Sequence, residues 1–350
     1  MFKQSPPDRI CMVRLSAIGD TCQALAVARA IQDTWPETRI TWILGKTEAS
    51  LLADIPDIEF IIFDKAKGIA AYQQVRRKLA GKSFDAALCM HASLRANFLY
   101  PLIRTAHRIG YDPERARDYQ RLFTNQCIPA TKGLHVQDAM MSFARFIGVP
   151  EQVLRWDIPL STEHREFAAQ YRRNGQPLLL LSPCSSQRAR NFRNWSAENY
   201  AAAALNAVQK FGCHVVLTGG QSAVEQHYAQ SILAKLGGDA SNLMGRTSLK
   251  QLLALIDEAN CLLCPDSGPA HMATTVGTPV IGLYATSNPD RTGPYLSRHL
   301  TVNAYPHAVK KYLGKGVGEV RWGQRVRDAG AMELIPLVDV NERIAAVFGS

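Results

Sequence analysis

The first regular segment of the chain is Ile10-Cys-Met-Val-Arg-Leu15, which is followed directly by Ser16-Ala-Ile-Gly-Asp20. The first six residues are mostly apolar and rich in β-formers, which indicates a buried strand. After the short connection, apolar residues recur at helical spacing until Pro36, where the proline stops the helix. These apolar residues are Leu25, Val27, Ala28 and Ile31. Strand, tight loop and helix in this order begin a βαβ unit, so we expect a parallel sheet covered by helices.

The same alternation continues through both halves of the chain. In the first half, strands are predicted at 40–44, 58–63 and 86–90, with helices at 47–53 and 70–80. In the second half, strands are predicted at 178–182, 214–218, 261–264 and 280–283, with helices at 197–209 and 222–236. The fold class is therefore α/β, with two similar Rossmann-type, doubly wound halves.

The alternation pauses between these halves, where residues 151–177 are polar and rich in turn formers. We place the boundary near residues 155–175, which gives an N-terminal domain of residues 1–160 and a C-terminal domain of residues 161–350. The last predicted helix, 338–348, has no strand after it. We expect it to pack back on the first domain.

Composition limits the function classes. The chain has 350 residues, and 40 Lys and Arg against 30 Asp and Glu give a net charge of +10, which predicts an acidic partner. Apolar residues make up 47% and charged residues 20%, which is ordinary globular usage and argues against disorder. The chain has no apolar run of about 18 residues, and Pro6-Pro7 interrupts the place of a signal peptide, so we expect a cytoplasmic protein.

Eight cysteines are spread along the chain, mostly inside apolar stretches, which is typical of reduced core thiols. Cys261-Leu-Leu-Cys264 is the one CxxC. In a strand, positions three apart point to opposite faces, so a shared metal or redox pair is not expected there.

Loops that follow strands carry the ligands of doubly wound folds. In the first such loop, Gly19 permits a tight turn, and Asp20 lies near a helix N-terminus, where a carboxylate is favoured. A purely structural alternative is that Asp20 or Ser16 only caps the helix. The loop contains neither G-x-G-x-x-G nor a phosphate-cradling G-x-x-x-x-G-K-[ST] motif.

A second loop, Cys264-Pro-Asp-Ser-Gly-Pro-Ala-His271, follows a predicted strand and opens a helix. Pro269 suits the first helical turn, and the free N–H groups from Gly268 to His271 form a phosphate site. Asp266 can cap the helix or bind a sugar hydroxyl. His271 can donate to a phosphate, although a lone histidine is more often structural.

A third loop, from Ser182 to Trp195, carries Ser185 and three arginines: Arg188, Arg190 and Arg193. A guanidinium group can bind two phosphate oxygens at once, so the loop is a candidate anion-binding site. The alternative is a solvated basic loop. Thr218 and Gly219 end a strand and either let the backbone approach a nucleotide or form a simple turn. A basic belt in the first half could grip a phosphorylated acceptor or be a solvated face; it comprises Arg104, His107, Arg108, Arg115, Arg117 and Arg121.

Six segments in this order resemble the ADP-heptose:lipopolysaccharide heptosyltransferases, glycosyltransferase family 9. They are Arg14–Asp20, Arg193–Trp195, Val215–Gly220, Asp266–His271, Gly277–Pro279 and Asn288–Tyr295. The resemblance covers nearly the whole chain, and it is the ordered set that is specific. It implies a GT-B fold, in which two Rossmann-like domains face a central cleft.

The resemblance implies an inverting transfer of L-glycero-D-manno-heptose from an ADP-linked donor to Kdo of the lipopolysaccharide inner core, with no obligatory metal or other cofactor. By the resemblance, Asp20 is the general base, and the donor is bound by Arg193 and the Asp266, Ser267, Gly268 and His271 segment. Ser185, Thr218 and Gly219 are further donor candidates. The acceptor candidates are Ser16, Gly19, Arg108, Arg115 and Arg117.

Within the family, the first half is most similar to heptosyltransferase I, which acts on Kdo-lipid A. The similar stretches are Arg39–Glu48, Arg108–Asp112 and Arg115–Asp118. An acidic acceptor on an anionic membrane would explain the positive charge, with the enzyme held peripherally at the inner face of the inner membrane. One alternative is a GT-B enzyme with another donor or acceptor. A nucleic-acid-binding protein is the other, although the chain has no helix-turn-helix, zinc-finger or RNP pattern and we expect no nucleic-acid partner.

Overall fold

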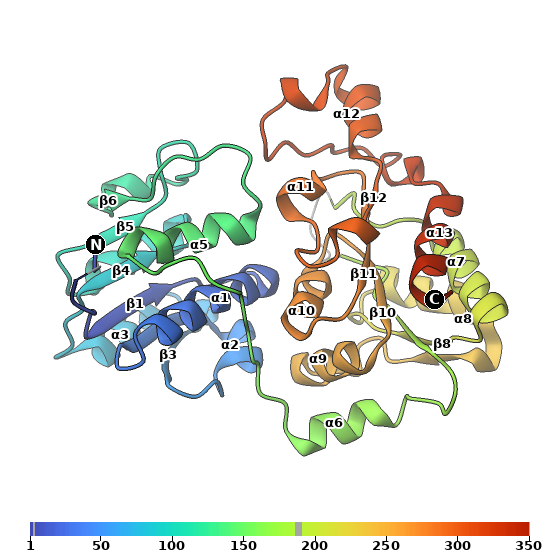
Figure 1. Ribbon diagram of the computed structural model, residues 1–350, viewed down its shortest axis with the longest axis horizontal. Coiled ribbons are helices and arrows are strands. Elements are labelled where there is room, and N and C mark those ends of the chain that lie inside the picture. The colour runs from blue at the N-terminus through green and yellow to red at the C-terminus, as the bar shows by residue number, and fades with distance from the viewer. Residues whose placement is uncertain (3, 186–190, 350) are drawn as a thin grey trace. The chain divides into compact units, whose positions relative to one another are not determined.

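The computed structural model describes residues 1–2, 4–185 and 191–349. It divides into two compact units, Met1–Pro159 and Leu160–Ser350. Each contains a six-stranded sheet in which every strand pair is parallel (Figure 1). The two doubly wound units expected from the alternation of strands and helices are therefore present.

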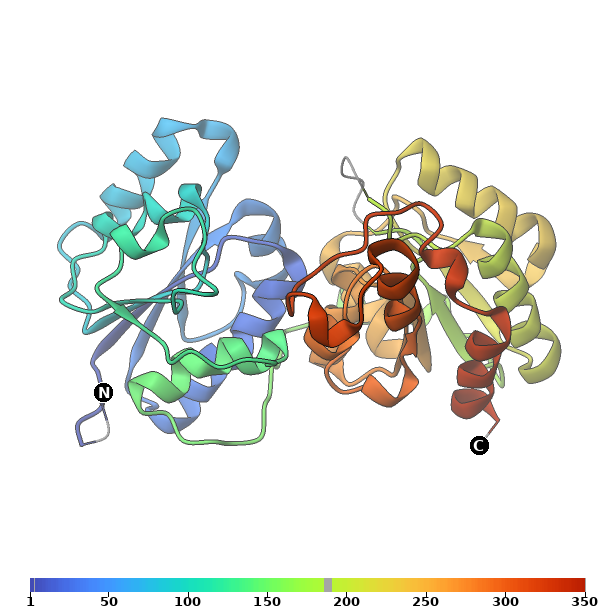
Figure 2. The same cartoon turned by 90° about the horizontal axis from the view of Figure 1, so that it is seen from above.

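In the first unit the strand order is β3-β2-β1-β4-β5-β6. The strands are β1 (Arg9–Val13), β2 (Arg39–Gly45), β3 (Ile58–Phe63), β4 (Ala86–Cys89), β5 (Arg108–Gly110) and β6 (Gln126–Cys127). The helices are α1 (Ile18–Thr34), α2 (Lys46–Leu52), α3 (Ile69–Leu79), α4 (Leu94–Asn97) and α5 (Val136–Ile147). Helices α1 and α5 pack together on one face of the sheet, and α3 lies on the other (Figure 2).

In the second unit the order is β12-β11-β10-β7-β8-β9. Its strands are β7 (Leu178–Leu181), β8 (His214–Leu217), β9 (Ala240–Asn242), β10 (Cys261–Pro265), β11 (Val280–Tyr284) and β12 (Val302–Asn303). Its helices are α6 (Thr162–Ala169), α7 (Ala197–Phe211), α8 (Ala223–Leu236), α9 (Leu249–Glu258), α10 (Gly268–Val276), α11 (Pro289–Thr292), α12 (Tyr305–Leu313) and α13 (Leu337–Phe348). Read from β9, this order repeats the topology of the first unit.

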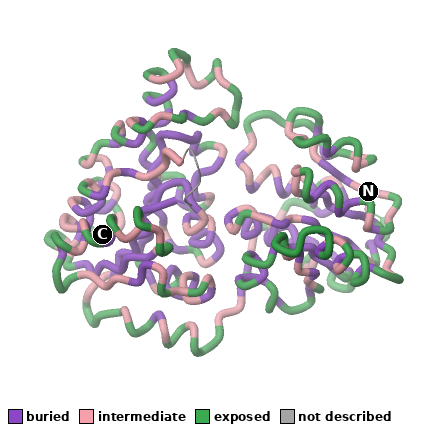
Figure 3. Tube along the Cα trace, turned by 180° about the vertical axis from the view of Figure 1, so that it is seen from behind, coloured by how far each residue is buried: buried purple, intermediate pink, exposed green. Residues whose placement is uncertain are grey.

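The central strands are buried along their whole length, as parallel strands covered on both faces must be (Figure 3). The direction of chain crossover reverses between β1 and β4 in the first sheet and between β7 and β10 in the second. Ligands of doubly wound folds bind beyond the carboxyl ends of the strands at such switch points. The loops after these four strands are therefore where a site is expected.

The expected packing of the last helix on the first domain is wrong. Helix α13 packs on α7, where the rings of Phe211 and Phe348 lie 6.2 Å apart, and it also contacts β11 and β12. Val340 and Ile344 are fully buried in the core of the second unit. The apolar face of α13 thus completes the core of its own unit.

Three other features escaped the sequence patterns. The stretch expected to be a polar connection contains α6, whose N-terminus is capped by Ser161 and which packs on α9. Ala168 is the one residue of α6 that is buried, so the helix has little apolar periodicity. Helix α9 was not predicted either, nor were the short strands β5, β6, β9 and β12, which have only two or three residues each.

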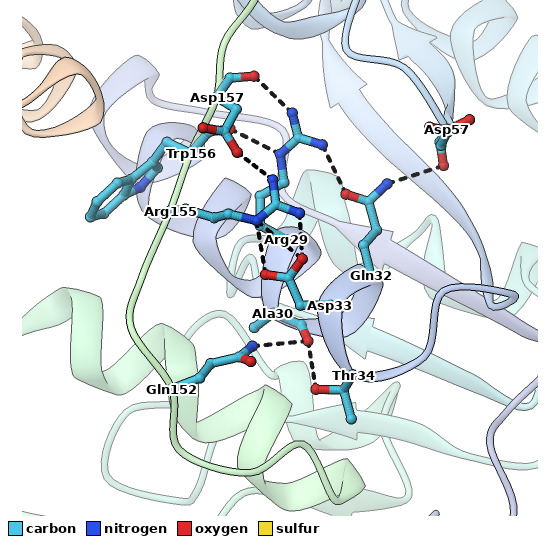
Figure 4. A network of polar contacts seen from close by, with 10 residues as sticks. All are labelled: Arg29, Ala30, Gln32, Asp33, Thr34, Asp57, Gln152, Arg155, Trp156 and Asp157. Atoms are coloured by element: carbon cyan, nitrogen blue, oxygen red, sulfur yellow. Dashed lines mark hydrogen bonds and ion pairs between the residues drawn. The ribbon is translucent and has the colours of Figure 1, made fainter.

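The segment that leads to the boundary between the units is held along α1 (Figure 4). The buried Arg29 donates from Nε to the carbonyl of Trp156 (2.9 Å) and from Nη2 to the carbonyl of Asp157 (2.7 Å). Gln152 Nε2 donates to the carbonyl of Ala30 (3.0 Å). The helix that begins at the Asp20 loop therefore also fixes the chain up to Asp157.

Candidate active site

Arg14 and Asp20 form the centre of the loop that follows β1. Arg14 Nη2 lies 2.5 Å from Asp20 Oδ2, and Arg14 Nη1 donates to the carbonyl of Met90 (2.6 Å) after β4. Burial would lower the pKa of Arg14, but the Asp20 carboxylate outweighs it and the pKa is raised. The pair therefore ties the loop after β1 to the loop after β4 at the switch point.

Asp20 lies in the first turn of α1, as the sequence predicted, and Oδ2 also accepts from the N–H of Ala17 (3.2 Å). The Asp20 side chain is 37% exposed, whereas that of Arg14 is 12% exposed. Gly19 is buried and Ser16 is half-buried in the same loop. The loop therefore presents a partly exposed carboxylate that is held by a largely buried cation.

His91 supports this loop from behind. Its Nδ1 accepts from the N–H of Leu15 (3.1 Å), so the second ring nitrogen carries the proton of the neutral imidazole. Burial, together with the positive charge of Arg14, lowers the pKa of His91 to about 4.

On the other side of the loop, the N–H of Gly45 donates to the carbonyl of Leu15 (3.0 Å), and a Cβ at Gly45 would lie 2.4 Å from that oxygen. Only glycine allows this close approach.

Glu48, on α2, is a second carboxyl group close to the loop. It is buried, and its pKa is raised, chiefly by desolvation, with a further contribution from the negative charge of Asp20. Its carboxylate lies where a Cβ at Gly45 would project. It therefore lines the same loop without the exposure that Asp20 has.

In the second unit, Arg193 and Asp266 join the loops after β7 and β10. Arg193 Nη1 donates to the carbonyl of Asp266 (2.8 Å) and lies 3.9 Å from Asp266 Oδ2. The same carboxylate oxygen accepts from Ser287 Oγ (2.8 Å) and is 3.9 Å from Arg325 Nη2. Two cations and one anion thus gather at the second switch point, which leaves an excess of positive charge.

The helix after this loop, α10, begins at Gly268 with proline in its first turn, as predicted. Ser267 is its N-cap residue, and its side chain makes no capping hydrogen bond. Backbone N–H groups at a helix start attract anions. His271 lies one turn into α10 and is half-buried. The helix start and Arg193 together can bind a phosphate.

Ser185 is buried in a polar cluster at the other end of the Arg193 loop. Its Oγ donates to Asn191 Oδ1 (2.8 Å) and to Asn194 Oδ1 (3.1 Å), and Asn191 Oδ1 also accepts from the backbone N–H of Arg193 (3.3 Å). Ser185 therefore shapes the backbone that presents Arg193. Arg188 and Arg190, the other candidates for the phosphate role, lie outside the described residues.

The other predicted donor contacts lie after β8. Thr218 is buried, and its hydroxyl donates to the carbonyl of Leu181 (3.4 Å). A Cβ at Gly219 would lie 2.6 Å from Met244 Sδ, so the backbone passes close to that side chain. Thr218 thus joins the loop after β8 to the end of β7, and Gly219 brings it close to the segment after β9. The contact of both residues with a donor stays a prediction.

The three arginines expected at the acceptor have different surroundings. Arg108 donates to the carbonyls of Tyr100 (3.2 Å) and Ile103 (3.4 Å), whereas Arg115 pairs with Asp112 and donates to the carbonyl of Pro129 (2.9 Å). Arg117 is exposed. The first two guanidinium groups hold the irregular segment after β4, and an acceptor role for all three stays a prediction.

The CxxC cysteines behave as core residues. Cys261 and Cys264 are buried in β10, and burial raises the pKa of Cys261 to about 12. Within the described part of the chain, no group of three or more His, Cys, Asp and Glu side chains is arranged to hold a metal ion. Nor does that part contain a helix long and apolar enough to cross a bilayer.

Several site residues were not singled out from the sequence. They either contact residues that are distant along the chain or belong to a local sequence pattern with no distinctive feature. These residues are His91, Glu48, Asn191, Asn194 and Arg325. The position of His91 directly after a predicted strand is the one signal that could have identified it.

Comparison with known proteins identifies the family of this chain. Residues 72–315 match the model of glycosyltransferase family 9 (heptosyltransferase). The lipopolysaccharide core heptosyltransferase OpsX of Haemophilus influenzae is 39% identical over 340 residues, which cover 97% of this chain and 96% of that protein. The lipopolysaccharide heptosyltransferase 2 of Escherichia coli is 23% identical over 87% of this chain and 90% of that protein.

Solved structures share the fold. A glycosyl transferase of family 9 from Veillonella parvula superposes with a TM-score of 0.78 at 20% identity, covering 97% of each chain. The E. coli heptosyltransferase WaaC with ADP superposes with a TM-score of 0.73 at 17% identity, covering 97% of this chain and 99% of that one. At these identities the likeness shows the fold alone, which is the GT-B architecture expected from the sequence.

Proposed function

The chain belongs to glycosyltransferase family 9, the heptosyltransferases, and from this membership we propose that it moves L-glycero-D-manno-heptose from ADP-heptose to Kdo of the lipopolysaccharide inner core. The 39% sequence identity to OpsX, a lipopolysaccharide core heptosyltransferase, supports a role in the synthesis of the lipopolysaccharide core. The ADP bound to the similar WaaC structure supports the donor. Likeness of the first half to heptosyltransferase I makes Kdo-lipid A, with or without a phosphate, the acceptor.

The observation that carries the proposal is the Arg14–Asp20 pair at the start of α1. An acceptor hydroxyl loses its proton as it attacks the anomeric carbon, and a carboxylate within hydrogen-bond reach can take it. Asp20 would be this general base, while Ser16 and Gly19 shape the loop that receives the acceptor. Direct attack by the acceptor on the face opposite the leaving group inverts the anomeric configuration.

The second unit would bind the donor and stabilise the leaving ADP. Negative charge develops on the diphosphate in the transition state, and preorganised donors stabilise it without reorganisation. Arg193 and the N–H groups from Gly268 to His271 would supply these donors. Asp266, held between Arg193 and Ser287, would orient a ribose or heptose hydroxyl. Arg193 and the helix N–H groups would supply the positive charge that a metal ion would otherwise provide. We therefore propose that transfer needs no metal or other cofactor.

The acceptor carries lipid A, so we propose that the enzyme works peripherally at the cytoplasmic face of the inner membrane. The net charge of +10 favours an anionic surface there. No contact with nucleic acid is part of this function.

The test is calorimetric titration with ADP and with UDP, each without divalent metal and then with Mg²⁺, followed by transfer from ADP-heptose to Kdo-lipid A. We expect selective, metal-independent binding of ADP and a product of inverted anomeric configuration by NMR. Selective binding of UDP would show that the donor is a UDP-sugar and not ADP-heptose. Transfer only to a heptosylated core would show that the acceptor is not Kdo-lipid A. Binding of neither nucleotide would refute the proposal.

A further inference from the structure

Four large apolar side chains of the first unit lie exposed on two segments that follow β4 and β5. The exposed fractions are 48% for Leu94, 54% for Phe98, 74% for Tyr119 and 80% for Leu122. Leu94 is on α4, Phe98 directly follows it, and the other two residues belong to or border the short helix η3 (Gln120–Leu122). We call these four residues the apolar patch.

The two segments are fastened to each other, so the patch is one surface. The N–H of Leu94 donates to Asp118 Oδ2 (3.2 Å), and the buried Asn97 donates from Nδ2 to the carbonyl of Asp118 (2.6 Å). The rings of Phe98 and Phe123 lie edge to face with centroids 5.6 Å apart. The exposed side chains are therefore presented by a fixed backbone.

Helix α3 extends the same surface. The hydroxyl of Tyr72 donates to the carbonyl of Arg95 (3.1 Å), which joins α3 to α4. Ile69 lies one turn before Tyr72 and is 77% exposed. An exposed apolar side chain is thus also present on a helix that is joined to the patch.

The charged side chains on the two segments of the patch are mostly positive. Residues 94–104 and 117–122 contain four arginines, all exposed, and one acidic residue: Arg95, Arg104, Arg117, Arg121 and Asp118. The carboxylate of Asp118 already accepts from the N–H of Leu94. The surface therefore has an apolar centre and a positive rim.

We propose that this surface docks the first unit on an anionic phospholipid bilayer. Apolar and aromatic side chains that project from a positive face are the combination that binds the interface of an anionic membrane. A protein partner would need matching acidic groups, whereas anionic headgroups supply them at any orientation. The inference extends the proposed function, because an acceptor anchored in lipid must be met at a membrane surface.

The test is sedimentation of the full chain with vesicles, one set of phosphatidylcholine alone and one with about a third phosphatidylglycerol, without donor or acceptor. We expect binding to the anionic vesicles that weakens with salt. Arg95→Gln with Arg121→Gln should lower the partition coefficient about thirtyfold, since each basic residue at such a surface contributes about fivefold. Tyr119→Asn with Leu122→Ser should also weaken binding, and Asn suits the left-handed backbone of Tyr119 (φ 61°).

Matched controls change equally exposed residues elsewhere. Val153→Ser removes an apolar side chain that is 92% exposed, and Arg165→Gln with Arg172→Gln removes two exposed charges from the second unit. These controls should bind like the wild type, and thermal unfolding checks that every variant is folded. The proposal would be overturned if the wild-type protein did not bind anionic vesicles, or if the patch variants bound them as well as the controls do.

Heptosyl transfer to a deacylated, soluble acceptor separates this inference from the proposed function. Tyr119→Asn with Leu122→Ser, which changes no residue of the acceptor candidates or the basic belt, should transfer heptose to it at the wild-type rate. If the wild type binds vesicles but transfers no heptose, the proposed function fails and the docking surface stands. If it transfers heptose but does not bind vesicles, the docking surface fails alone.

Discussion

Arg14 Nη2 lies 2.5 Å from Asp20 Oδ2, and the same guanidinium donates to the carbonyl of Met90 after the neighbouring strand β4. One buried cation thus fixes both the carboxylate and the two loops at the switch point of the first sheet. The pair holds the Asp20 carboxylate in place while its side chain remains partly exposed to solvent. We propose Asp20 as the general base, and the first two predictions follow from its pairing with Arg14.

Asp20→Asn should lower the turnover number by about 100- to 10,000-fold, because the amide keeps the acceptor for the N–H of Ala17 but cannot take a proton. Affinity for ADP should stay the same, because the donor-binding residues belong to the second unit. Steady-state kinetics and calorimetry measure the two quantities. Asp33→Asn, at the other end of α1, is the control and should retain activity. An inactive variant that is also unfolded would make Asp20 a structural residue.

Arg14→Met should move the acid limb of the kcat/KM profile to higher pH, because the Asp20 carboxylate loses the positive charge that favours its ionised form. The rate at the pH optimum should fall as well, since the carboxylate is no longer held in place. Arg14→Lys restores the charge and should move the limb back. A pH profile that does not move in Arg14→Met would show that the pair has no part in proton transfer.

Arg193→Ala should weaken ADP binding about 10- to 100-fold, the usual effect of losing a charged hydrogen bond to a phosphate. Removal of its bond to the carbonyl of Asp266 also frees the loop after β10. Arg172→Ala, which removes an exposed charge from the same unit, is the control. The same titration on Arg188→Ala and Arg190→Ala identifies which of the three arginines binds the phosphate. Unchanged affinity in Arg193→Ala would remove it from the donor site.

Local sequence patterns predicted the central part of both sheets. Buried parallel strands are continuous apolar runs, so 86–90 and 178–182 were recognisable from the sequence, and the loops after β1 and β10 followed from the same pattern. Pro269 correctly marked the start of α10. By contrast, α6 was missed because it buries a single residue, and β5, β6, β9 and β12 are too short to show a period.

Long-range contacts were beyond such reasoning. Leu15 and His91 are 76 positions apart, and Arg29 meets the carbonyl of Trp156 127 positions further on. No periodicity encodes these bonds, because they depend on which loops the sheet order brings together. The wrong prediction for the packing of the last helix has the same cause. An apolar face shows that a helix is covered, but it does not show which unit covers it.

His91 should make the first unit sensitive to acid. Its pKa is about 4 in the folded state against 6.5 ordinarily, so the folded state binds fewer protons between these values. Stability should therefore fall as the pH decreases from about 6.5 to about 4, and change no further through this group below that. His91→Asn keeps an acceptor for the N–H of Leu15 and does not titrate, so its stability should depend less on pH. Urea unfolding at several pH values measures this, and equal slopes for both proteins would contradict it.

Arg29 and Arg155 hold the same segment to α1 but should differ in their effect on stability (Figure 4). Arg29 is buried and donates to two backbone carbonyls, so Arg29→Met should destabilise the first unit by about 2–4 kcal/mol. Arg155 pairs with Asp33 at the surface, where the two side chains are 41% and 34% exposed, so Arg155→Met should cost under about 1 kcal/mol. Urea unfolding followed by tryptophan fluorescence compares the two variants. Equal losses would mean that the surface ion pair, and not the buried guanidinium, fastens the segment from Gln152 to Asp157 to α1.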